Sequence, residues 1–337
     1  MWPSEAEPDL GAFLLPLVRG LRAMGHDVEI VGLSQRGGSP VKYARLCARA
    51  VRAARAFRPD VVFAHFLFPA GAAGLAAARA VGAPLVVMAH GQDVANLDGV
   101  AVRTATRVVV RGAARVIANS EWLAGRLRRW FPGVDVTVAD LGVDLARFSP
   151  GAAAPAAWPE GAGPRFLCVG SLIERKNVVA LADAFEGLGG RGSLVFVGDG
   201  PLRGALEGRP GVSVVGRVAH DEVRGWIEAC DVLCQPSLAE PFGLATLEAM
   251  ALERTVVATT AGGPPEFVTP EAGVLVDPHD LAALTSALAT ASTFPTPNPA
   301  ARVAAAAHDA SRQAARMAAV LEEAVAESSQ RSAANRV

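Results

Sequence analysis

The sequence predicts an α/β protein with two Rossmann-like domains, each a doubly wound parallel sheet, and two observations predict this fold class. Short, continuous apolar runs alternate with helical patterns along the chain, which is typical of parallel sheets covered by helices on both faces. A stretch rich in Pro, Gly and Ala at 149–164 divides this alternation into two halves and is the natural linker. With 337 residues, 51% of them hydrophobic, the chain has enough apolar material for two cores.

The first domain is expected over residues 1–148. Its strands are predicted at the β-rich runs Val28–Val31, Val61–Ala64, Leu85–Met88, Val116–Ala118 and Val136–Val138. Helical patterns separate these runs, at about 11–24, 41–57, 70–81, 97–112 and 119–129.

The second domain is expected over residues 165–298 and repeats the same alternation. An Ala-rich helical pattern, about 300–327, follows Pro299. Six strands are predicted, at Phe166–Val169, Leu194–Val197, Val212–Val215, Val232–Cys234, Val256–Ala258 and Val274–Val276.

Bulk properties favour a cytoplasmic protein. The nearest candidate for a membrane span, Val61 to Ala78, is interrupted by His65 and Pro69, so no span is predicted. Acidic residues crowd the N-terminus, which argues against a signal peptide. The four cysteines have neither zinc spacing nor a pairing pattern, as expected of buried free thiols in a reducing compartment.

The net charge of −1 hides an asymmetry between the two halves. Residues 1–150 hold 18 Lys and Arg against 12 Asp and Glu, whereas the rest hold 14 against 21. Basic residues recur in the first half at helical spacing, which places them on common helix faces. Two interpretations stay open: a solvated surface, or a face that binds an anionic acceptor or docks peripherally on the inner face of an anionic membrane. Basic–aromatic interleaving is too sparse to predict nucleic-acid binding. The sets at helical spacing are Lys42, Arg45, Arg49 and Arg52, and Arg103, Arg107 and Arg111, whereas Arg126, Arg128, Arg129, Trp130 and Phe131 form a basic–aromatic end.

Glu240 and Glu248 are the most informative pair of residues in the chain. They follow a predicted buried strand, and Pro241 and Gly243 between them are expected to open a helix that runs to about Leu252. The free N–H groups of such a helix end form an anion site. Along a helix the two carboxylates would be on the order of 10 Å apart. This distance is too long for two acids that act on one glycosidic bond. It suits two carboxylates that bind the two ends of an elongated phosphate-bearing ligand.

This segment resembles the E-x7-E motif of the retaining glycosyltransferases of family 4, which have the two-domain GT-B fold with a cleft between the domains. The resemblance implies that Glu240 meets the donor sugar and Glu248 binds the ribose hydroxyls of the nucleotide. It implies that the backbone of Phe242, Gly243 and Leu244 holds sugar hydroxyls and phosphate. It covers the chain from about Pro8 to Ala319, and it implies that the terminal helix packs back on the first domain.

Two adjacent cations, Arg175 and Lys176, open a helix after a predicted strand, where they could neutralise a diphosphate. Cations are unfavourable at a helix N-terminus unless an anion is bound there. The family pattern has a lysine at the place of Lys176, but Ser171 replaces its preceding arginine, so Lys176 is the firmer assignment. By resemblance, Arg217 and Val218 lie beside the nucleotide base.

In the first domain, His90 follows a buried strand in His-Gly-Gln-Asp, and the carboxyl ends of such strands carry ligand sites. The family has a matching motif whose histidine lies near the transferred sugar, so the resemblance implies a catalytic role for His90. His65 ends the preceding strand, and an acceptor-side role and a core role both stay open for it. The resemblance also implies that the backbone of Gly11 approaches the donor phosphate.

The sequence departs from the family at its start. Family members open with an apolar strand before the loop that residues 2–11 resemble, and Met1 starts inside that loop. We expect a first domain without this strand, and the native start to lie upstream.

The function expected from these residues is a retaining glycosyltransferase that moves a sugar from a nucleotide diphosphate sugar to an acceptor, by a metal-independent front-face mechanism. The acceptor, which could be a glycan, a lipid-linked sugar or a small molecule, is unidentified. No cofactor and no metal are predicted, since no D-x-D pair and no His/Cys cluster is present. Three alternatives stay open: a nucleotide-sugar epimerase of the same fold, a sugar phosphorylase of related fold, and a catalytically impaired nucleotide-sugar-binding protein.

Overall fold

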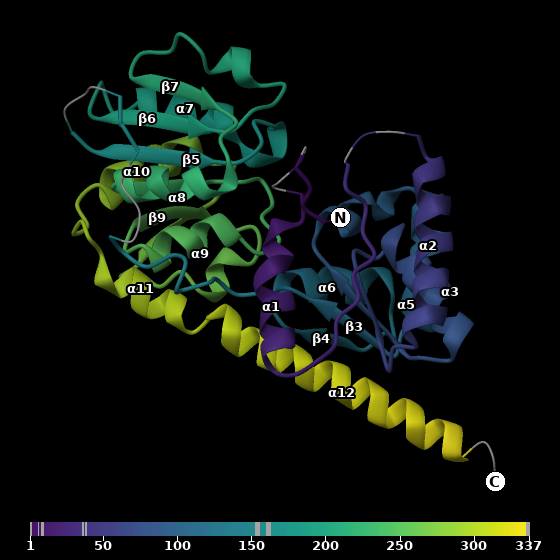
Figure 1. The fold of residues 1–337 in the computed structure, drawn as a ribbon. Coiled ribbons are helices and arrows are strands. Elements are labelled where there is room, and N and C mark those ends of the chain that lie inside the picture. Colours follow the sequence, from purple (N-terminus) through teal and green to yellow (C-terminus); the bar gives the residue numbers. More distant parts are fainter. Residues whose placement is uncertain are drawn as a thin grey trace. The chain divides into compact units, whose positions relative to one another are not determined.

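The chain folds into two compact units that each hold a parallel β-sheet between helices (Figure 1). The first unit comprises residues 1–141 and 310–337, and the second comprises residues 142–309. The structure, a computed structural model, describes residues 2–5, 7, 10–35, 37, 39–151, 156–159 and 163–334.

The first unit contains a four-stranded parallel sheet of order β1-β2-β3-β4. Helices α3, α5 and α6 cover one face of this sheet, whereas α1 and α12 cover the other. The strands are β1 (Val62–His65), β2 (Leu85–Ala89), β3 (Arg115–Ala118) and β4 (Val136–Val138). The helices are α1 (Leu15–Ala23), α2 (Val41–Phe57), α3 (Ala70–Val81), α4 (Gln92–Ala95), α5 (Val100–Gly112), α6 (Glu121–Trp130) and α12 (Ala310–Ala334), with 3₁₀ turns η1 (Ala12–Leu14) and η2 (Asn96–Asp98).

The strand predicted at Val28–Val31 is wrong, because this segment pairs with none of the strands of the sheet. A strand needs the backbone of a neighbour, and here the nearby carbonyls accept hydrogen bonds from other groups: Arg22 donates to the Val28 carbonyl and the N–H of Trp2 to Leu33. Residues 2–5 and 7 form no strand, and β1 is the first strand among the residues the structure describes.

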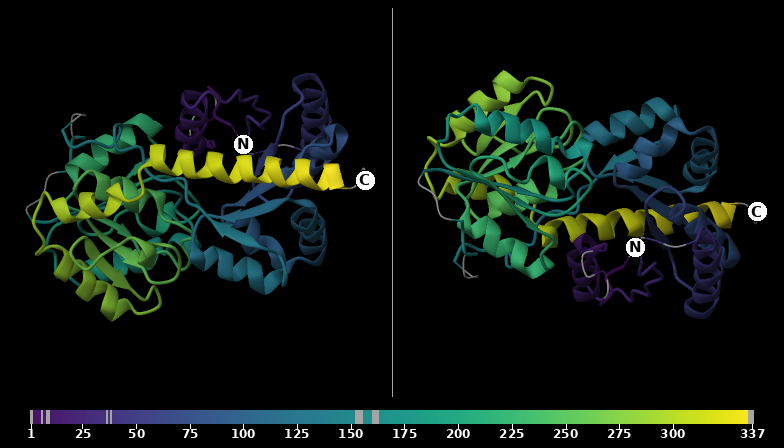
Figure 2. Two further views of the ribbon diagram at one scale, coloured as in Figure 1. Left: turned by 90° about the horizontal axis from the view of Figure 1, so that it is seen from below. Right: turned by 90° about the horizontal axis from the view of Figure 1, so that it is seen from above.

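The terminal helix expected at about 300–327 is in fact two helices. The carbonyl of His308 accepts the N–H of Val143, and Asp309 pairs with Val143 as an isolated parallel bridge, so the backbone at 307–309 leaves the helical path. The first helix, α11 (Pro299–Ala306), packs on α9 in the second unit. The second, α12, lies along the sheet of the first unit with α1 beside it (Figure 2). Helices α1 and α12 approach closely at Gly20, where a Cβ would lie 2.5 Å from the Cβ of Ala314.

The second unit contains a six-stranded parallel sheet of order β10-β9-β8-β5-β6-β7. The strands are β5 (Arg165–Val169), β6 (Ser193–Val197), β7 (Val212–Gly216), β8 (Val232–Gln235), β9 (Thr255–Thr259) and β10 (Gly273–Val276). The helices are α7 (Val178–Glu186), α8 (His220–Ala229), α9 (Leu244–Ala251), α10 (Leu281–Ala291) and α11, with 3₁₀ turns η3 (Glu174–Lys176), η4 (Arg203–Ala205) and η5 (Pro264–Glu266). This is the doubly wound order, in which the chain direction across the sheet reverses between β5 and β8.

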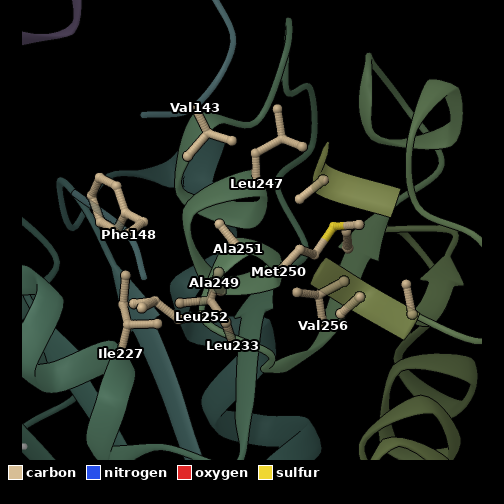
Figure 3. Close-up of a cluster of buried hydrophobic side chains, with 14 of the residues drawn as sticks. Val143, Phe148, Ile227, Leu233, Leu247, Ala249, Met250, Ala251, Leu252 and Val256 are labelled. Atoms are coloured by element: carbon tan, nitrogen blue, oxygen red, sulfur yellow. The ribbon is translucent and has the colours of Figure 1, made fainter. Parts of the chain in front are cut away.

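Helix α9 is held by the apolar core on one face of this second sheet. Figure 3 shows Leu247, Met250 and Ala251 of α9 inside the cluster, with Phe148 on one side and Val256 on the other. Because this helix is buried along most of its length, its first turn and the loop before it have a rigid support.

The predicted fold class is confirmed, and apart from Val28–Val31 each predicted strand is present with ends shifted by no more than one residue. Part of the predicted linker, 152–155 and 160–162, lies outside the described residues. Its neighbours 156–159 pack in the second unit, where the indole N–H of Trp158 donates to Ser193 Oγ at 2.7 Å. Among the described residues, none of the helices has the length and apolarity needed to span a membrane.

Candidate active site

The second unit brings two loops together at the point where its strand order reverses. Strands β5 and β8 are hydrogen-bonded neighbours, and both run toward the same edge of the sheet. The loop after β5 carries Arg175 and Lys176, and the loop after β8 carries Glu240. In doubly wound sheets this crevice at the carboxyl ends of the strands is where ligands bind.

Lys176 and Glu240 form a largely buried ion pair at this edge, with Nζ 2.6 Å from Oε2. Ser237 Oγ donates to the same carboxylate oxygen at 3.0 Å, and Gln235 Oε1 lies 3.5 Å from Nζ. Burial alone would raise the pKa of Glu240. The charge and hydrogen bond of Lys176, the charge of Arg175 and the Ser237 hydroxyl outweigh it, so the pKa is lowered. Glu240 is therefore ionised at neutral pH although it is only 8% exposed.

Arg175 contacts the loop that carries Glu240. Its guanidinium donates to the carbonyl of Ala239 at 3.0 Å, and its own carbonyl accepts the N–H of Leu238 at 2.9 Å. Arg175 thus ties the loop after β5 to the loop that carries Glu240, and it adds positive charge beside that carboxylate.

The backbone of Glu240 is fixed from the other side by the loop after β9. Its N–H donates to Ala261 at 3.0 Å, and its carbonyl accepts from Gly263 at 2.9 Å. Gly262 passes so close that a Cβ there would overlap the Glu240 carbonyl oxygen. The carboxylate therefore extends from a backbone held by hydrogen bonds on two sides.

Helix α9 begins at Leu244, three residues later than the Pro241 start that the sequence predicts. Gly243 has φ 103° and ψ 51°, a left-handed conformation that a right-handed helix cannot include. No described side chain caps this helix, so the N–H groups of Gly243 and Leu244 remain available to an anion. Phe242 lies in the turn before them, with its ring 5.5 Å from that of Phe267.

Glu248 lies within α9, only 8% exposed, and no hydrogen bond or ion pair to its carboxyl group is found among the described residues. Burial raises its pKa to about 7, and the charge of Arg147 offsets this only in part. Arg147 itself donates to Asp221 at 2.8 Å. The two glutamates of the motif thus differ: Glu240 is a paired carboxylate, whereas Glu248 is largely protonated below neutral pH.

The remaining donor-side residues follow β7. Arg217 is exposed, and Val218 is half-buried against the core that includes α9. Gly216, just before them, has φ 91° and closes a tight turn at the carboxyl end of the strand.

In the first unit, His90 is paired with His65. Their rings come from the carboxyl ends of β2 and β1, and His65 Nδ1 lies 3.0 Å from His90 Nε2. The backbone around His90 is held by buried Asp93, which accepts the N–H groups of His90, Gly91 and Leu67 at 2.9–3.1 Å. Gly11 is buried, with φ 74°, immediately before η1.

Sequence reasoning left His65 undecided and did not assign Ser237, Gln235 or Arg147. Asp93 was visible in the His-Gly-Gln-Asp motif, and its position three residues after His90 is the spacing of a carboxylate that accepts backbone N–H groups in a tight turn. Ser237 and Gln235 gave no signal, because they act only through the fold that places them beside Lys176. Throughout the described part of the chain, no group of three or more His, Cys, Asp or Glu side chains is arranged to hold a metal ion.

Two Rossmann-like units, the second with a charged cluster at its switch point, define the GT-B class of glycosyltransferase fold. A family model described as Glycosyltransferase Family 4 matches residues 10–147, and one described as Glycosyl transferases group 1 matches residues 163–293. The chain therefore belongs to the glycosyltransferases that these two family models describe.

Two relatives illustrate the match. The D-inositol 3-phosphate glycosyltransferase of Streptomyces scabiei is 32% identical over 306 residues, which are 78% of this chain and 68% of that protein. TuaC of Bacillus subtilis, a glycosyltransferase assigned to teichuronic acid biosynthesis, is 29% identical over 238 residues. That match covers 68% of this chain and 60% of TuaC, so the chain spans about three fifths of that relative.

Solved structures share the fold at low identity. Sucrose-phosphate synthase from Thermosynechococcus elongatus has a TM-score of 0.78 and 22% identity, with 97% of this chain and 96% of that chain covered. Anabaena Alr3699/HepE in complex with UDP and glucose has a TM-score of 0.70 and 22% identity, covering 90% of this chain and 88% of the other.

Proposed function

We propose that this protein is a retaining glycosyltransferase that uses a nucleotide diphosphate sugar as donor. One observation carries the proposal: an ionised glutamate, paired with a lysine at the switch point of the second sheet, lies just before a helix end whose N–H groups are uncapped. A carboxylate suits sugar hydroxyls, and the adjacent cation and amides suit a diphosphate.

Each residue has a distinct role in this proposal. Glu240 orients the donor sugar through its hydroxyls, while Lys176 and the N–H groups of Gly243 and Leu244 stabilise the diphosphate as its bond to the sugar breaks. Glu248, about one helical turn into α9, takes the ribose hydroxyls. Arg175 is a positioning residue, because its guanidinium bonds the loop that carries Glu240.

The reaction then proceeds on one face of the sugar. The bond from the anomeric carbon to the diphosphate oxygen breaks, the acceptor oxygen bonds to that carbon from the same side, and the departing diphosphate oxygen takes the acceptor's proton. Glu240 does not act as a nucleophile in this scheme, because Lys176 and Ser237 already engage the oxygen Oε2 of its carboxylate. The negative charge that develops is met by Lys176 and by helix dipoles, so the scheme needs no metal ion.

The donor class draws support from a structural neighbour, since Anabaena Alr3699/HepE was solved with UDP and glucose. The relative from Streptomyces scabiei is named for a phosphorylated polyol, which supports a hydroxyl-bearing acceptor. We place this acceptor on the first unit, near His90.

The acceptor or its carrier is proposed to be anionic, because the first unit presents basic helices. Helices α2, α3 and α5 contain no acidic residue. Apolar side chains are exposed on the same helices, among them Tyr43, Phe57, Val100 and Val108. Basic helices that also expose apolar groups fit peripheral contact with an anionic membrane, which a membrane-bound acceptor would require.

A donor panel tests the function. Thermal unfolding is followed with UDP-, GDP-, ADP- and TDP-sugars, and a donor at about 100 times its Kd should stabilise the fold by ~2.7 kcal/mol. With the donor that binds, NMR of the product should show a new glycoside with the anomeric configuration of the donor. Conversion of the donor sugar without a new glycoside would identify an epimerase, and no shift with any donor would contradict the proposal.

A further inference from the structure

The carboxyl ends of β1 and β2 carry a histidine pair that the donor-side chemistry does not explain. His65 Nδ1 and His90 Nε2 are 3.0 Å apart, within hydrogen-bonding distance. Aromatic rings surround the pair: Phe13 and Phe66 lie 5.1 and 4.6 Å from the His90 ring, and Phe63 lies 4.4 Å from the His65 ring.

Both imidazoles are neutral in this setting. Burial lowers the pKa of His65 to about 3, and burial followed by the repulsion of His65 lowers the pKa of His90 well below its usual value. A hydrogen bond between two neutral imidazoles uses one N–H and one lone pair. The bond therefore occupies Nε2 of His90 and leaves Nδ1 as the only ring nitrogen for a ligand.

The protonation of the pair is coupled through this bond. If His90 Nε2 donates, both rings are in the Nε2–H form and His90 Nδ1 is an acceptor. If His65 Nδ1 donates, both are in the Nδ1–H form and His90 Nδ1 is a donor. The Nε2–H form is the more stable one for a neutral imidazole in water, and the rings of Phe13, Phe63 and Phe66 carry no hydrogen-bonding group that would favour the other form.

The backbone around the pair is unusually constrained. Asp93 fixes the N–H groups of His90 and Gly91, and Phe66 directly after His65 has φ 75°, a left-handed conformation that is strained for a bulky residue. Its carbonyl accepts the N–H of Gly71 at 2.9 Å, which helps to hold it there. Such strain is typical of sites where a side chain must be aimed.

We infer that His65 is a positioning residue for His90: it accepts the Nε2–H of His90, fixes that ring, and leaves Nδ1 as a neutral acceptor for a hydroxyl of the bound sugar or acceptor. This inference rests on the proposed glycosyltransferase function for the identity of that hydroxyl. The pairing itself can be tested without any substrate.

The test uses the full chain with ¹⁵N-labelled histidines and no ligand. Long-range ¹H–¹⁵N correlations distinguish the tautomers, and both His65 and His90 should be neutral Nε2–H rings. His65→Asn keeps an amide oxygen in place of Nδ1, so His90 should remain in the Nε2–H form. His65→Phe keeps a ring without an acceptor, so His90 should become a mixture of tautomers.

Phe63→Leu is the matched control, because it removes a ring contact of His65 but keeps the hydrogen bond. It should leave the His90 tautomer unchanged. An Nδ1–H form of His90 in the wild type, or an unchanged His90 in His65→Phe, would overturn the inference. If His65→Phe fails to fold, the wild-type tautomer and His65→Asn still decide.

Kinetics provide the second readout. His65→Phe should lower kcat about tenfold to a hundredfold, as expected when a side chain that contacts the substrate loses its orienting partner, with little change in KM for the donor. His65→Asn should restore most of this loss. If no donor gives a glycoside, the proposed function fails, yet the tautomers still test the histidine pair. Equal kcat for wild type and His65→Phe would contradict the positioning role.

Discussion

Replacing Glu248 by glutamine should stabilise the second unit at alkaline pH, even though we propose that Glu248 binds ribose. Burial raises the pKa of this carboxyl from 4.5 to about 7. Between these two pH values the unfolded chain releases the proton while the folded chain keeps it. Stability is therefore lost as pH rises from about 4.5 to about 7.

The size of the effect follows from the pKa values. One pKa unit corresponds to ~1.36 kcal/mol, so a rise from 4.5 to about 7 corresponds to about 3 kcal/mol of destabilisation above pH 7. Glutamine has nearly the same shape and no charge to desolvate. Glu248→Gln should therefore unfold at higher urea concentration than the wild type at pH 8. The difference in the free energy of unfolding between the two proteins should be smaller by about 3 kcal/mol at pH 4.5.

Urea unfolding at several pH values checks this, followed by tryptophan fluorescence, to which the Trp158–Trp226 pair of the second unit contributes. The control is Glu271→Gln, an exposed glutamate of the same unit, which should show no such gain. The same Glu248→Gln variant should bind free nucleotide more weakly, because an amide cannot accept hydrogen bonds from two ribose hydroxyls as a carboxylate does. A stability difference that does not change with pH would refute the reasoning about burial, and equal nucleotide affinity would refute the ribose assignment.

Three further predictions concern the ion pair, the Glu240 loop and the basic helices. Lys176→Ala should cost on the order of 2–4 kcal/mol of transition-state stabilisation in kcat/KM. Arg175→Ala should cost less, and the opposite order would show that the diphosphate cation is misassigned. Gly262→Ala should destabilise the fold in a thermal melt, because its Cβ would overlap the Glu240 carbonyl, whereas Gly204→Ala, with nothing within 4 Å of the new Cβ, should change little. Equal melting temperatures for these two variants would contradict the packing argument. The chain should co-sediment with anionic but not neutral vesicles at low salt, and charge reversal of exposed arginines should abolish this. Equal sedimentation with both vesicle types would leave a soluble acceptor. The arginines to reverse are Arg45, Arg52 and Arg107.

The sequence predicts most of this fold because buried parallel strands have continuous apolar sequences, as in Leu194–Val197. It fails at Val28–Val31, where the local pattern is that of a strand but no neighbouring strand is available among the described residues. The break at His308 is also invisible locally, since it depends on pairing with Val143, far away in the chain. Both failures have one cause: the decisive hydrogen bonds are tertiary.

The candidate site shows the same division between local and tertiary information. The E-x7-E spacing marks Glu240 and Glu248, yet no local pattern indicates that Lys176, 64 residues earlier, forms an ion pair with Glu240. That pairing follows from the sheet order, which places the ends of β5 and β8 side by side. His65 could not be decided from the sequence for a similar reason, because only the register of β1 against β2 brings it to His90.

The pKa values of the two buried glutamates are shifted in opposite directions, lowered for Glu240 and raised for Glu248, and this difference suits their proposed roles. In the proposed role Glu240 orients a sugar as a carboxylate, and its ion pair with Lys176 lowers its pKa and so keeps it ionised at neutral pH. Glu248 has no such partner among the described residues, and burial raises its pKa to about 7. In its proposed role Glu248 accepts two ribose hydroxyls as a carboxylate, so nucleotide binding below about pH 7 should release a proton from Glu248. The buried carboxyl therefore lowers the stability of the protein at pH values where it is ionised, and in its proposed role ribose hydroxyls would satisfy that ionised form.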